Sequence, residues 1–383
     1  MGKIRSHGEG SLYRRKDGLW VAQVTLQGKL LYKYARTQHE ARAWLEATRD
    51  QIKGGLTHAA AQINLERFLQ EWLNAYESSI RPKTFQQYAQ IVNQYLSPGL
   101  GRIKLKDLRP DQIQWFYSTE FKQGRSARTI LLIHSVLHRA LNQALGWGLI
   151  GRNPAQPVIR PKLQKTEMKT LTNFQAIDLL QSAKGSRLEA LLWLALTTGL
   201  REGELLGLKW SDLDWTTSRL KIQRQLQRLR GKGLVFTEPK SSAGRRGVTL
   251  SSDIISRLRS HRVVQAYERL FAGDRWQEYD LIFPSTIGSP LDPRNLYRQF
   301  KSALRSAALP DIRFHDLRHT AATLMLQQHT HPKVVQERLG HSDIALTLNT
   351  YSHVLPDIQE EAAETISRAL LPSRNEIHGV EPK

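Results

Sequence analysis

The sequence predicts a multidomain α+β protein in three parts: an N-terminal three-stranded sheet plus one helix, a four-helix domain, and a mixed, mainly helical domain with a small antiparallel sheet. Three observations lead to this class. Residues 10–35 read as three short strands, the second with alternating apolar residues, and apolar residues recur at helical spacing in 62–153. A proline-rich stretch without a period, residues 154–168, then reads as a linker. The length of 383 residues allows two or three domains.

Residues 1–55 are expected to form the sheet module. Alternation places four side chains of its second strand on one face: Trp20, Ala22, Val24 and Leu26. Thr37 and Glu40 form a capping box that opens a helix running to about Lys53. Residues 1–60 hold 11 Lys and Arg against 5 Asp and Glu. The module is therefore either a plain solvated unit or a sheet that enters a DNA groove.

Residues 62–153 are expected to form the helical domain. The first predicted helix covers 64–76, and the second begins at Pro82 and is stopped by Pro98 and Gly99. The third begins near Asp111, and the fourth runs from Ser126 to about Trp147. The aromatic side chains of these helices recur at helical spacing. They are therefore expected in the core first, and on a base-stacking surface only second.

Residues 169–371 should form the third domain, followed by a tail, 372–383. The pattern is helix, helix, then strands, with strands 219–227 and 234–239 flanking a Gly231-Lys232-Gly233 hairpin turn. Helices resume from 252, and a short strand is expected at 280–283. The last predicted helix, 356–371, is amphipathic and places four apolar residues in one row: Ile358, Ala362, Ile366 and Leu370.

Charge is the strongest compositional signal, because 56 Lys and Arg against 35 Asp and Glu give a formal net charge of +21. A surplus this large favours a polyanionic partner, and its spread along the whole chain suits a long nucleic acid. The absence of cysteine excludes disulfides, thiolate metal sites and cysteine nucleophiles. No lipidation motif, signal peptide or bilayer-length apolar run is found. These features predict a cytoplasmic, nucleoid-associated protein without a membrane partner.

The segment FHDLRHT, residues 314–320, carries an unusual set of donors. On a helix, His315, Arg318 and His319 share one side, which taken alone would suit a solvated polar face. Three more segments bear isolated polar residues beside ordered elements. They are LALTTGLREGELLGLKWSDLD (194–214) with Arg201, TEPKSSAGRRGVTL (237–250) with Lys240, and LGHSDIALTLNTYSHV (339–354) with His341 and Tyr351.

Together and in this order, the four segments resemble the tyrosine recombinase, or phage integrase, family. The family's signature is a first arginine in TGLRxxEL, a hairpin lysine, HxLRH, LGH, and a tyrosine about ten residues later. The catalytic resemblance covers roughly residues 170–370, and the helical domain resembles the family's core-binding domain. The N-terminal sheet resembles the arm-binding domain of the family's integrases.

The resemblance implies a site-specific recombinase that cuts and rejoins DNA through a covalent 3′-phosphotyrosine on Tyr351. Arg201 and Arg318 suit a phosphate clamp, because guanidinium groups stay charged and present paired donors. Lys240 suits the general acid and His315 the general base. The sixth residue of this catalytic set is His341, expected to position the phosphate. No metal, cofactor or ATP is then required.

Other residues are expected to support this chemistry. Glu204 should orient Arg201, and His319 should be structural. The expected DNA contacts are Arg14, Arg15, Gln23 and Lys33 in the sheet module. Arg245 and Arg246 are expected either to contact the DNA backbone or to be solvated.

The implied partners are double-stranded DNA with core and arm sites, a homotetramer on that DNA, and excision or host DNA-bending factors. The alternatives are a chromosome or plasmid dimer resolvase of the same family, a type IB topoisomerase, or a catalytically silent DNA-binding regulator.

Overall fold

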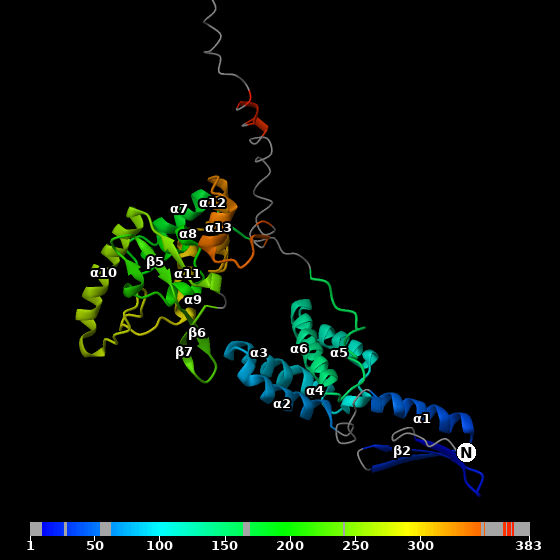
Figure 1. Cartoon of the computed structure of the whole chain (residues 1–383). Coiled ribbons are helices and arrows are strands. Elements are labelled where there is room, and N and C mark those ends of the chain that lie inside the picture. Colours follow the sequence, from blue (N-terminus) through cyan, green and yellow to red (C-terminus); the bar gives the residue numbers. More distant parts are fainter. Residues whose placement is uncertain are drawn as a thin grey trace, which may run out of the picture. The chain divides into compact units, whose positions relative to one another are not determined.

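The computed structural model describes residues 10–26, 29–53, 63–163, 169–239 and 242–345, together with a few single residues between 348 and 370. The chain divides into two units, residues 1–165 and 166–383 (Figure 1). Its helices are accompanied by three small antiparallel sheets, so the predicted mixed α+β class is confirmed.

The N-terminal module is a three-stranded antiparallel sheet with one helix against it. Strands β1 (Ser11–Arg14), β2 (Trp20–Leu26) and β3 (Lys29–Ala35) pair in sequence order, and α1 covers Gln38–Lys53. The N–H of Glu40 donates to Thr37 Oγ1 at 3.2 Å, which is half of the predicted capping box. The module's buried core consists of Ala22, Val24, Ala35, Ala41 and Leu45. The side chain of Leu26, predicted on this face, lies outside the described part.

The helical domain contains α2 (Leu65–Tyr76), α3 (Pro82–Ile91), a π-helical stretch (Val92–Leu96), α4 (Ser97–Leu100), α5 (Pro110–Lys122) and α6 (Ala127–Gly146). The side chains of Asn64 and Ser126 cap α2 and α6 by accepting backbone N–H groups. Phe68 and Trp72 of α2 are fully buried. The aromatic residues of α2 thus lie in the core, as their spacing predicts.

Pro98 and Gly99 do not stop the second helix, contrary to the prediction. The backbone widens before the proline, where Ser97 N–H bonds the carbonyl of Val92, five residues back. Pro98 then lies in the first turn of α4, where its missing N–H costs no bond. Gly99 serves packing instead, because a Cβ there would lie 2.3 Å from Phe116 of α5.

The first residues of the predicted linker belong to the helical core. Ala155 and Val158 are buried in it, and Asn153 donates through Nδ2 to the carbonyl of His138 at 3.1 Å. The stretch that packs against this domain therefore reaches Val158 rather than ending at Asn153.

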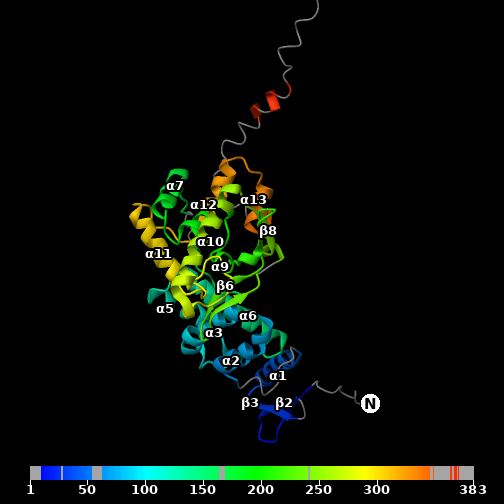
Figure 2. The same cartoon turned by 90° about the vertical axis from the view of Figure 1, so that its left-hand side faces the viewer.

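The C-terminal unit is built around the buried helix α8 (Glu189–Thr198). Its other helices are α7 (Asn173–Ser182), α9 (Glu202–Leu206), α10 (Ser252–Ala272), α11 (Pro293–Ser306), α12 (Asp316–Gln327) and α13 (Pro332–Leu339). Helices α7, α10 and α12 pack on α8, and α11 lies against α7 (Figure 2). One sheet has the order β4 (Leu213–Asp214), β5 (Arg219–Ile222), β8 (Arg246–Thr249).

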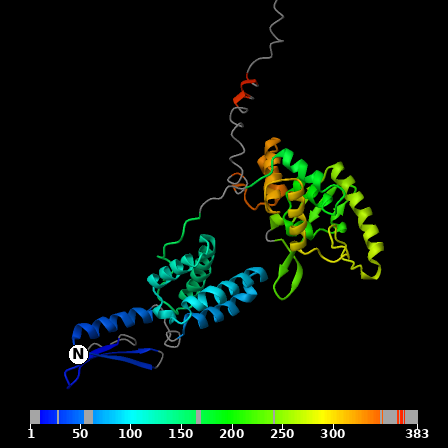
Figure 3. The ribbon, with the colours of Figure 1, turned by 180° about the vertical axis from the view of Figure 1, so that it is seen from behind.

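A separate hairpin, β6 (Gln225–Leu229) with β7 (Gly233–Thr237), projects from this unit (Figure 3). The Gly231-Lys232-Gly233 turn is confirmed, with positive φ at both glycines. The single strand predicted for 219–227 is wrong, because it splits into β5 and β6 in two different sheets. Between them, Arg224 pairs with the buried carboxylate of Asp212, which fixes the chain where it changes sheets.

The strand predicted at 280–283 is reduced to one bridge, between Lys209 and Leu281. Its three apolar residues, Leu281, Ile282 and Phe283, are buried, but they meet the loop after α9 rather than a strand. Most of the predicted helix 356–371 lies outside the described residues, including Ile358 and Ala362. Ile366 and Leu370 are described and exposed. None of the described helices is long and apolar enough to cross a membrane.

Candidate active site

Arg201 follows a sharp helix end that the sequence dictates. Helix α8 stops at Gly199, which has φ +65° and lies so close to α13 that a Cβ would sit 2.4 Å from Leu339. Leu200 is buried, and Arg201 then forms the N-terminal boundary of α9. The arginine is therefore fixed between two packed helices, as predicted.

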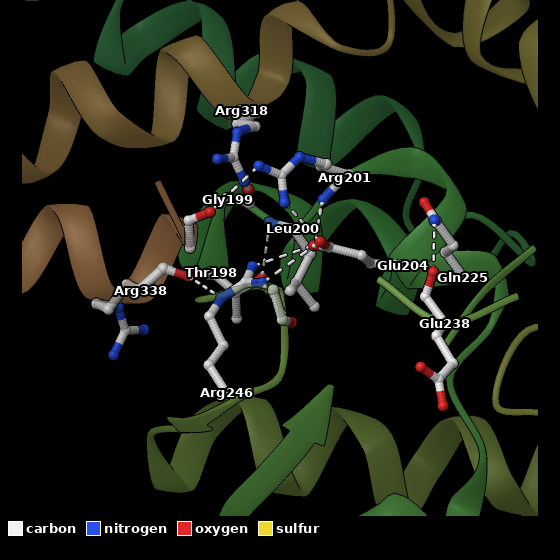
Figure 4. A network of polar contacts seen from close by, with 12 residues as sticks. Thr198, Gly199, Leu200, Arg201, Glu204, Gln225, Glu238, Arg246, Arg318 and Arg338 are labelled. Atoms are coloured by element: carbon white, nitrogen blue, oxygen red, sulfur yellow. Dashed lines mark hydrogen bonds and ion pairs between the residues drawn. The ribbon is translucent and has the colours of Figure 1, made fainter. Parts of the chain in front are cut away.

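The buried carboxylate of Glu204 orients Arg201 (Figure 4). Arg201 Nη1 donates to Glu204 Oε1 at 2.7 Å, and the backbone N–H of Arg201 donates to Oε2 at 3.0 Å. Arg246 of β8 donates to Oε2 from the other side at 3.1 Å. The Glu204 side chain is 2% exposed, so its ionised form depends on these two cations. Despite its burial, the pKa of Glu204 is lowered, chiefly by Arg246 and then by Arg201.

Arg318 comes to the same place from α12. Its Nη1 donates to the carbonyl of Gly199 at 2.8 Å, and the residue is 3% exposed. Thr320 anchors the helix by accepting the N–H of Leu171 at 3.0 Å. In Figure 4 the guanidinium groups of Arg318 and Arg201 lie beside each other over the end of α8. The two halves of the predicted phosphate clamp are thus brought together.

His341 is placed by the turn that ends α13. Gly340 has φ +68°, and its carbonyl accepts Arg201 Nη2 at 3.3 Å. The carbonyl of His341 accepts Gln336 Nε2 at 3.0 Å, which holds the turn.

Three histidines of the site are held neutral near pH 7. Desolvation of the rings by the surrounding protein lowers the pKa of His315 and His341 to about 4. Neighbouring His319 and Arg318 lower the pKa of His315 further, and Arg318 and Arg201 do so at His341. Burial also lowers the pKa of His319, whose ring meets that of His315 edge-on at 5.3 Å. His315 itself remains open to solvent. Neutral imidazoles beside two arginines can accept a proton or bond an anion.

The structure therefore gathers four of the six predicted catalytic residues, Arg201, His315, Arg318 and His341, on one side of the C-terminal unit. The other two, Lys240 and Tyr351, lie outside the described residues. The approach to Lys240 is defined, because Gln225 Nε2 donates to the carbonyl of Glu238 at 3.0 Å and fixes the end of the hairpin.

Arg246 does not fit its expected place as a DNA contact. Its side chain is 8% exposed and is turned into the protein, where it binds Glu204 and the carbonyl of Arg338. Arg245, the neighbouring candidate, is 60% exposed and pairs with Glu238. Sequence reasoning also missed Arg338, whose Nη2 donates to the carbonyl of Thr197 at 3.1 Å. Its position directly before the LGH segment was the only signal.

The four predicted DNA contacts of the N-terminal module lie on two different faces of its sheet. By strand register, Gln23 lies opposite Tyr32 on the face away from α1, whereas Lys33 lies opposite Ala22 on the helix-facing side. Arg14 shares Lys33's side because it pairs with Trp20, and its Nε donates to the carbonyl of Gly18 at 3.2 Å. The exposed tyrosines of the helix-free face are Tyr13, Tyr32 and Tyr34.

Arg15 adds charge to that tyrosine-rich face, since its guanidinium lies 5.4 Å from the ring centre of Tyr34. The three tyrosines of the free face were not predicted as contacts. The strand register reveals them, whereas the composition does not.

Two arginines and two neutral imidazoles in one place are residue types that suit phosphate chemistry, because they can supply donors to charge on non-bridging oxygens. Within the described ranges, no three His, Cys, Asp or Glu side chains are grouped so as to hold a metal ion. This combination of fold and residues is the kind expected of an enzyme that acts on phosphodiesters.

Comparison with known sequences places the chain within that class. The profile of the phage integrase family matches residues 162–357, and that of the phage integrase N-terminal SAM-like domain matches 64–120. A tyrosine recombinase XerC-like protein of Caldanaerobacter subterraneus subsp. tengcongensis is 32% identical over 379 residues, covering 92% of this chain and 97% of the relative. The chain belongs to the phage integrase family of tyrosine recombinases, as its motifs predict.

Further similar proteins are also integrases. An integrase of Streptomyces ambofaciens is 28% identical over 383 residues, covering 94% of this chain and 97% of its own. The Tn1549 transposon integrase, solved with circular intermediate DNA, has the same fold, with a TM-score of 0.69 at 20% identity over 80% of this chain and 100% of its own. A lambda integrase tetramer bound to a Holliday junction gives a TM-score of 0.56 at 22% identity over 91% of this chain and 96% of its own.

Proposed function

We propose that this recombinase integrates or excises a mobile element by cutting and rejoining duplex DNA through a 3′-phosphotyrosine on Tyr351. The observation that carries the proposal is the pairing of Arg201 and Arg318 beside His315 and His341. The Tyr351 oxygen attacks the phosphorus, and the bond to the 5′-oxygen breaks. The phosphodiester is exchanged rather than hydrolysed, so a 5′-hydroxyl can reverse the reaction and seal the strand.

The arginines stabilise the transition state. Its non-bridging oxygens gather negative charge, and two fixed guanidinium groups supply matching donors without reorganisation. Glu204 holds Arg201 at 2.7 Å and so keeps one half of the clamp from turning away. We therefore assign no metal and no ATP to the reaction.

Proton transfer falls to Lys240 and the histidines. A phenol has a pKa of roughly 10, so Tyr351 must lose its proton during attack. His315 is neutral and can accept that proton, and a bound phosphate raises its pKa from about 4 by placing negative charge beside the ring. Lys240 protonates the leaving 5′-oxygen, and His341 bonds the phosphate.

The N-terminal module binds separate arm sites, and the active assembly is a homotetramer on DNA, assisted by excision or host DNA-bending factors. The helix-free face of the sheet supports this role for the module, because exposed tyrosines, Gln23 and Arg15 can contact bases and phosphates. Integrases that match along 94% of this chain favour the integrase interpretation over the dimer resolvase and the silent regulator.

A covalent-adduct assay tests the proposal. On a nicked core-site duplex that traps the intermediate, the unmodified chain should form a protein–DNA adduct in excess EDTA without ATP. Tyr351→Phe should abolish the adduct but keep DNA affinity, because binding rests on many phosphate contacts. Tyr267→Phe, which alters an exposed tyrosine of the same unit, is the matched control and should react normally. An adduct that persists in Tyr351→Phe would remove Tyr351 from the nucleophile role.

A further inference from the structure

Arg246 is a buried arginine that binds its own segment and two others. Its Nη2 donates to Glu204 Oε2 at 3.1 Å, its Nε to the carbonyl of Arg338 at 2.6 Å, and its Nη1 to the carbonyl of Gly244 at 3.3 Å. Figure 4 shows its guanidinium between Glu204 and the end of α13. An arginine can do this because its planar group presents five donors in a fixed geometry.

Each partner stands next to a different predicted catalytic residue. Glu204 holds Arg201. The Arg338 carbonyl lies at the end of α13, three positions before His341 and on the segment that leads to Tyr351. Gly244 follows Lys240 by four positions in the sequence. One guanidinium therefore contacts the residue that holds Arg201 and two segments that adjoin the predicted acid and nucleophile in the sequence.

The surroundings of Arg246 leave its side chain little freedom. A Cβ on Gly340 would lie 2.7 Å from Arg246 Nη1 and 2.8 Å from the carbonyl of Ala243. The absence of a side chain at Gly340 is thus what allows the α13 turn and the 243–244 backbone to close around the guanidinium. A change at one of the three segments must displace Arg246 or break one of its bonds.

We infer that Arg246 is a positioning residue, which locks the loop that carries Lys240 and the segment that carries His341 and Tyr351 to the Glu204–Arg201 pair. The inference rests on the proposed function, because it assumes that these residues act together on one phosphate. It assigns to Arg246 no contact with DNA. With Arg246 in place, the three segments take up the reactive arrangement as one body, and without it they move independently.

The test compares Arg246→Gln with Arg224→Gln in the full-length chain. Arg224 is a matched control, since it too pairs with a carboxylate whose side chain is 2% exposed, that of Asp212, and it has no bond to Glu204 among those described. Each variant removes one arginine from a buried carboxylate, and in Arg246→Gln the Glu204 carboxylate still has Arg201 as a partner. Adduct formation is measured well below the melting temperature of each. We expect Arg246→Gln to slow cleavage about 100-fold, the scale of a 1 Å misplacement, while DNA affinity and the Arg224→Gln rate stay near the unmodified values.

Two readouts separate positioning from a merely structural role. Sulfur at the 5′-bridging position should rescue Lys240→Ala, which lacks only the acid, but should leave Arg246→Gln slow, because clamp and nucleophile are displaced too. The N–H groups of Gly340 and His341, both bonded to the Gln336 carbonyl, should exchange with solvent faster in Arg246→Gln than in Arg224→Gln. If Arg246→Gln does not fold, Arg246→Lys replaces it, keeping the charge but not the three-way geometry.

Equal cleavage rates in Arg246→Gln and Arg224→Gln, or full rescue of Arg246→Gln by sulfur, would overturn the inference while leaving the proposed function intact. Failure of the unmodified chain to form any adduct would instead contradict the proposed function. In that case the exchange of Gly340 and His341 still decides whether Arg246 ties the α13 turn to Glu204.

Discussion

Replacing Gly340 by alanine should destabilise the C-terminal unit far more than the same change at Gly185. Both glycines have positive φ, +68° and +73°, so a side chain is strained at either one. Their surroundings differ. At Gly340 a Cβ meets Arg246 Nη1 at 2.7 Å and the Ala243 carbonyl at 2.8 Å, whereas at Gly185 nothing lies within 4 Å.

Two contributions set the expected loss of stability: the strain of a left-handed backbone and the crowding around the added Cβ. The left-handed conformation costs an alanine about 1–2 kcal/mol at either position. Crowding adds about 1–3 kcal/mol at Gly340 alone, the usual cost of forcing extra volume into a packed site. Arg246 has little room to yield, because its guanidinium is bonded to Glu204 and to the Arg338 carbonyl. The free energy of unfolding should therefore fall by about 2–5 kcal/mol for Gly340→Ala and about 1–2 kcal/mol for Gly185→Ala.

The free energy of unfolding of this unit can be measured from the exchange of the most protected α8 amides in the full-length chain, which open only on global unfolding of the unit. Adduct formation is followed in parallel, and Gly340→Ala should lose activity beyond its loss of folded protein. Equal destabilisation by the two alanines would refute the reasoning, since it would mean that the α13 turn and Arg246 are not closely packed.

Four further predictions follow from the same geometry. DNA binding should take up protons, because His315 and His341 are neutral when free, with pKa values of about 4, and a bound phosphate raises both pKa values. Affinity should then increase as the pH falls from neutral toward the raised pKa values, and calorimetry in buffers of different ionisation enthalpy measures the proton uptake. Core-site affinity should fall steeply with salt, each neutralised phosphate adding about −0.9 to the log–log slope, and a flat titration would contradict a charge-driven interface. Lys240→Ala should be slow on normal DNA and recover on a 5′-sulfur substrate, whereas Arg318→Ala should not recover; equal recovery would take the acid role from Lys240. Removing residues 1–55 should spare core-site cleavage but shrink the footprint on long attachment-site DNA, and identical footprints would exclude arm binding by the module.

Local signals sufficed for much of the fold. The end of α8 at Gly199, the N-terminal cap at Ser126 and the hairpin turn at Gly231 depend on residues a few positions away, so the sequence predicts them. Pro98 and the residues around 223–224 were misjudged because tertiary contacts decide there. A π-helical stretch accommodates the proline, and a buried ion pair to Asp212 redirects the strand.

The same division holds within the site. Arg201 and Arg318 were predicted from motifs, and Glu204 from its place one helical turn after Arg201. Arg246 was misassigned because its partners come from residues 42 and 92 positions away, and no local pattern indicates that an arginine beside an exposed arginine is turned inward. Charge alone suggests DNA contact for both.

The bond from Arg318 to the Gly199 carbonyl spans 119 positions of sequence, which bears on how the protein is made. At ribosomal rates of about 5–20 residues per second, Arg318 is synthesised roughly 6–24 seconds after the end of α8. During that interval the emerging chain already carries the first arginine and a basic surface, yet it has only half a clamp. The two arginines of the clamp can thus come together only when α12 has folded onto the end of α8, late in the synthesis of the unit.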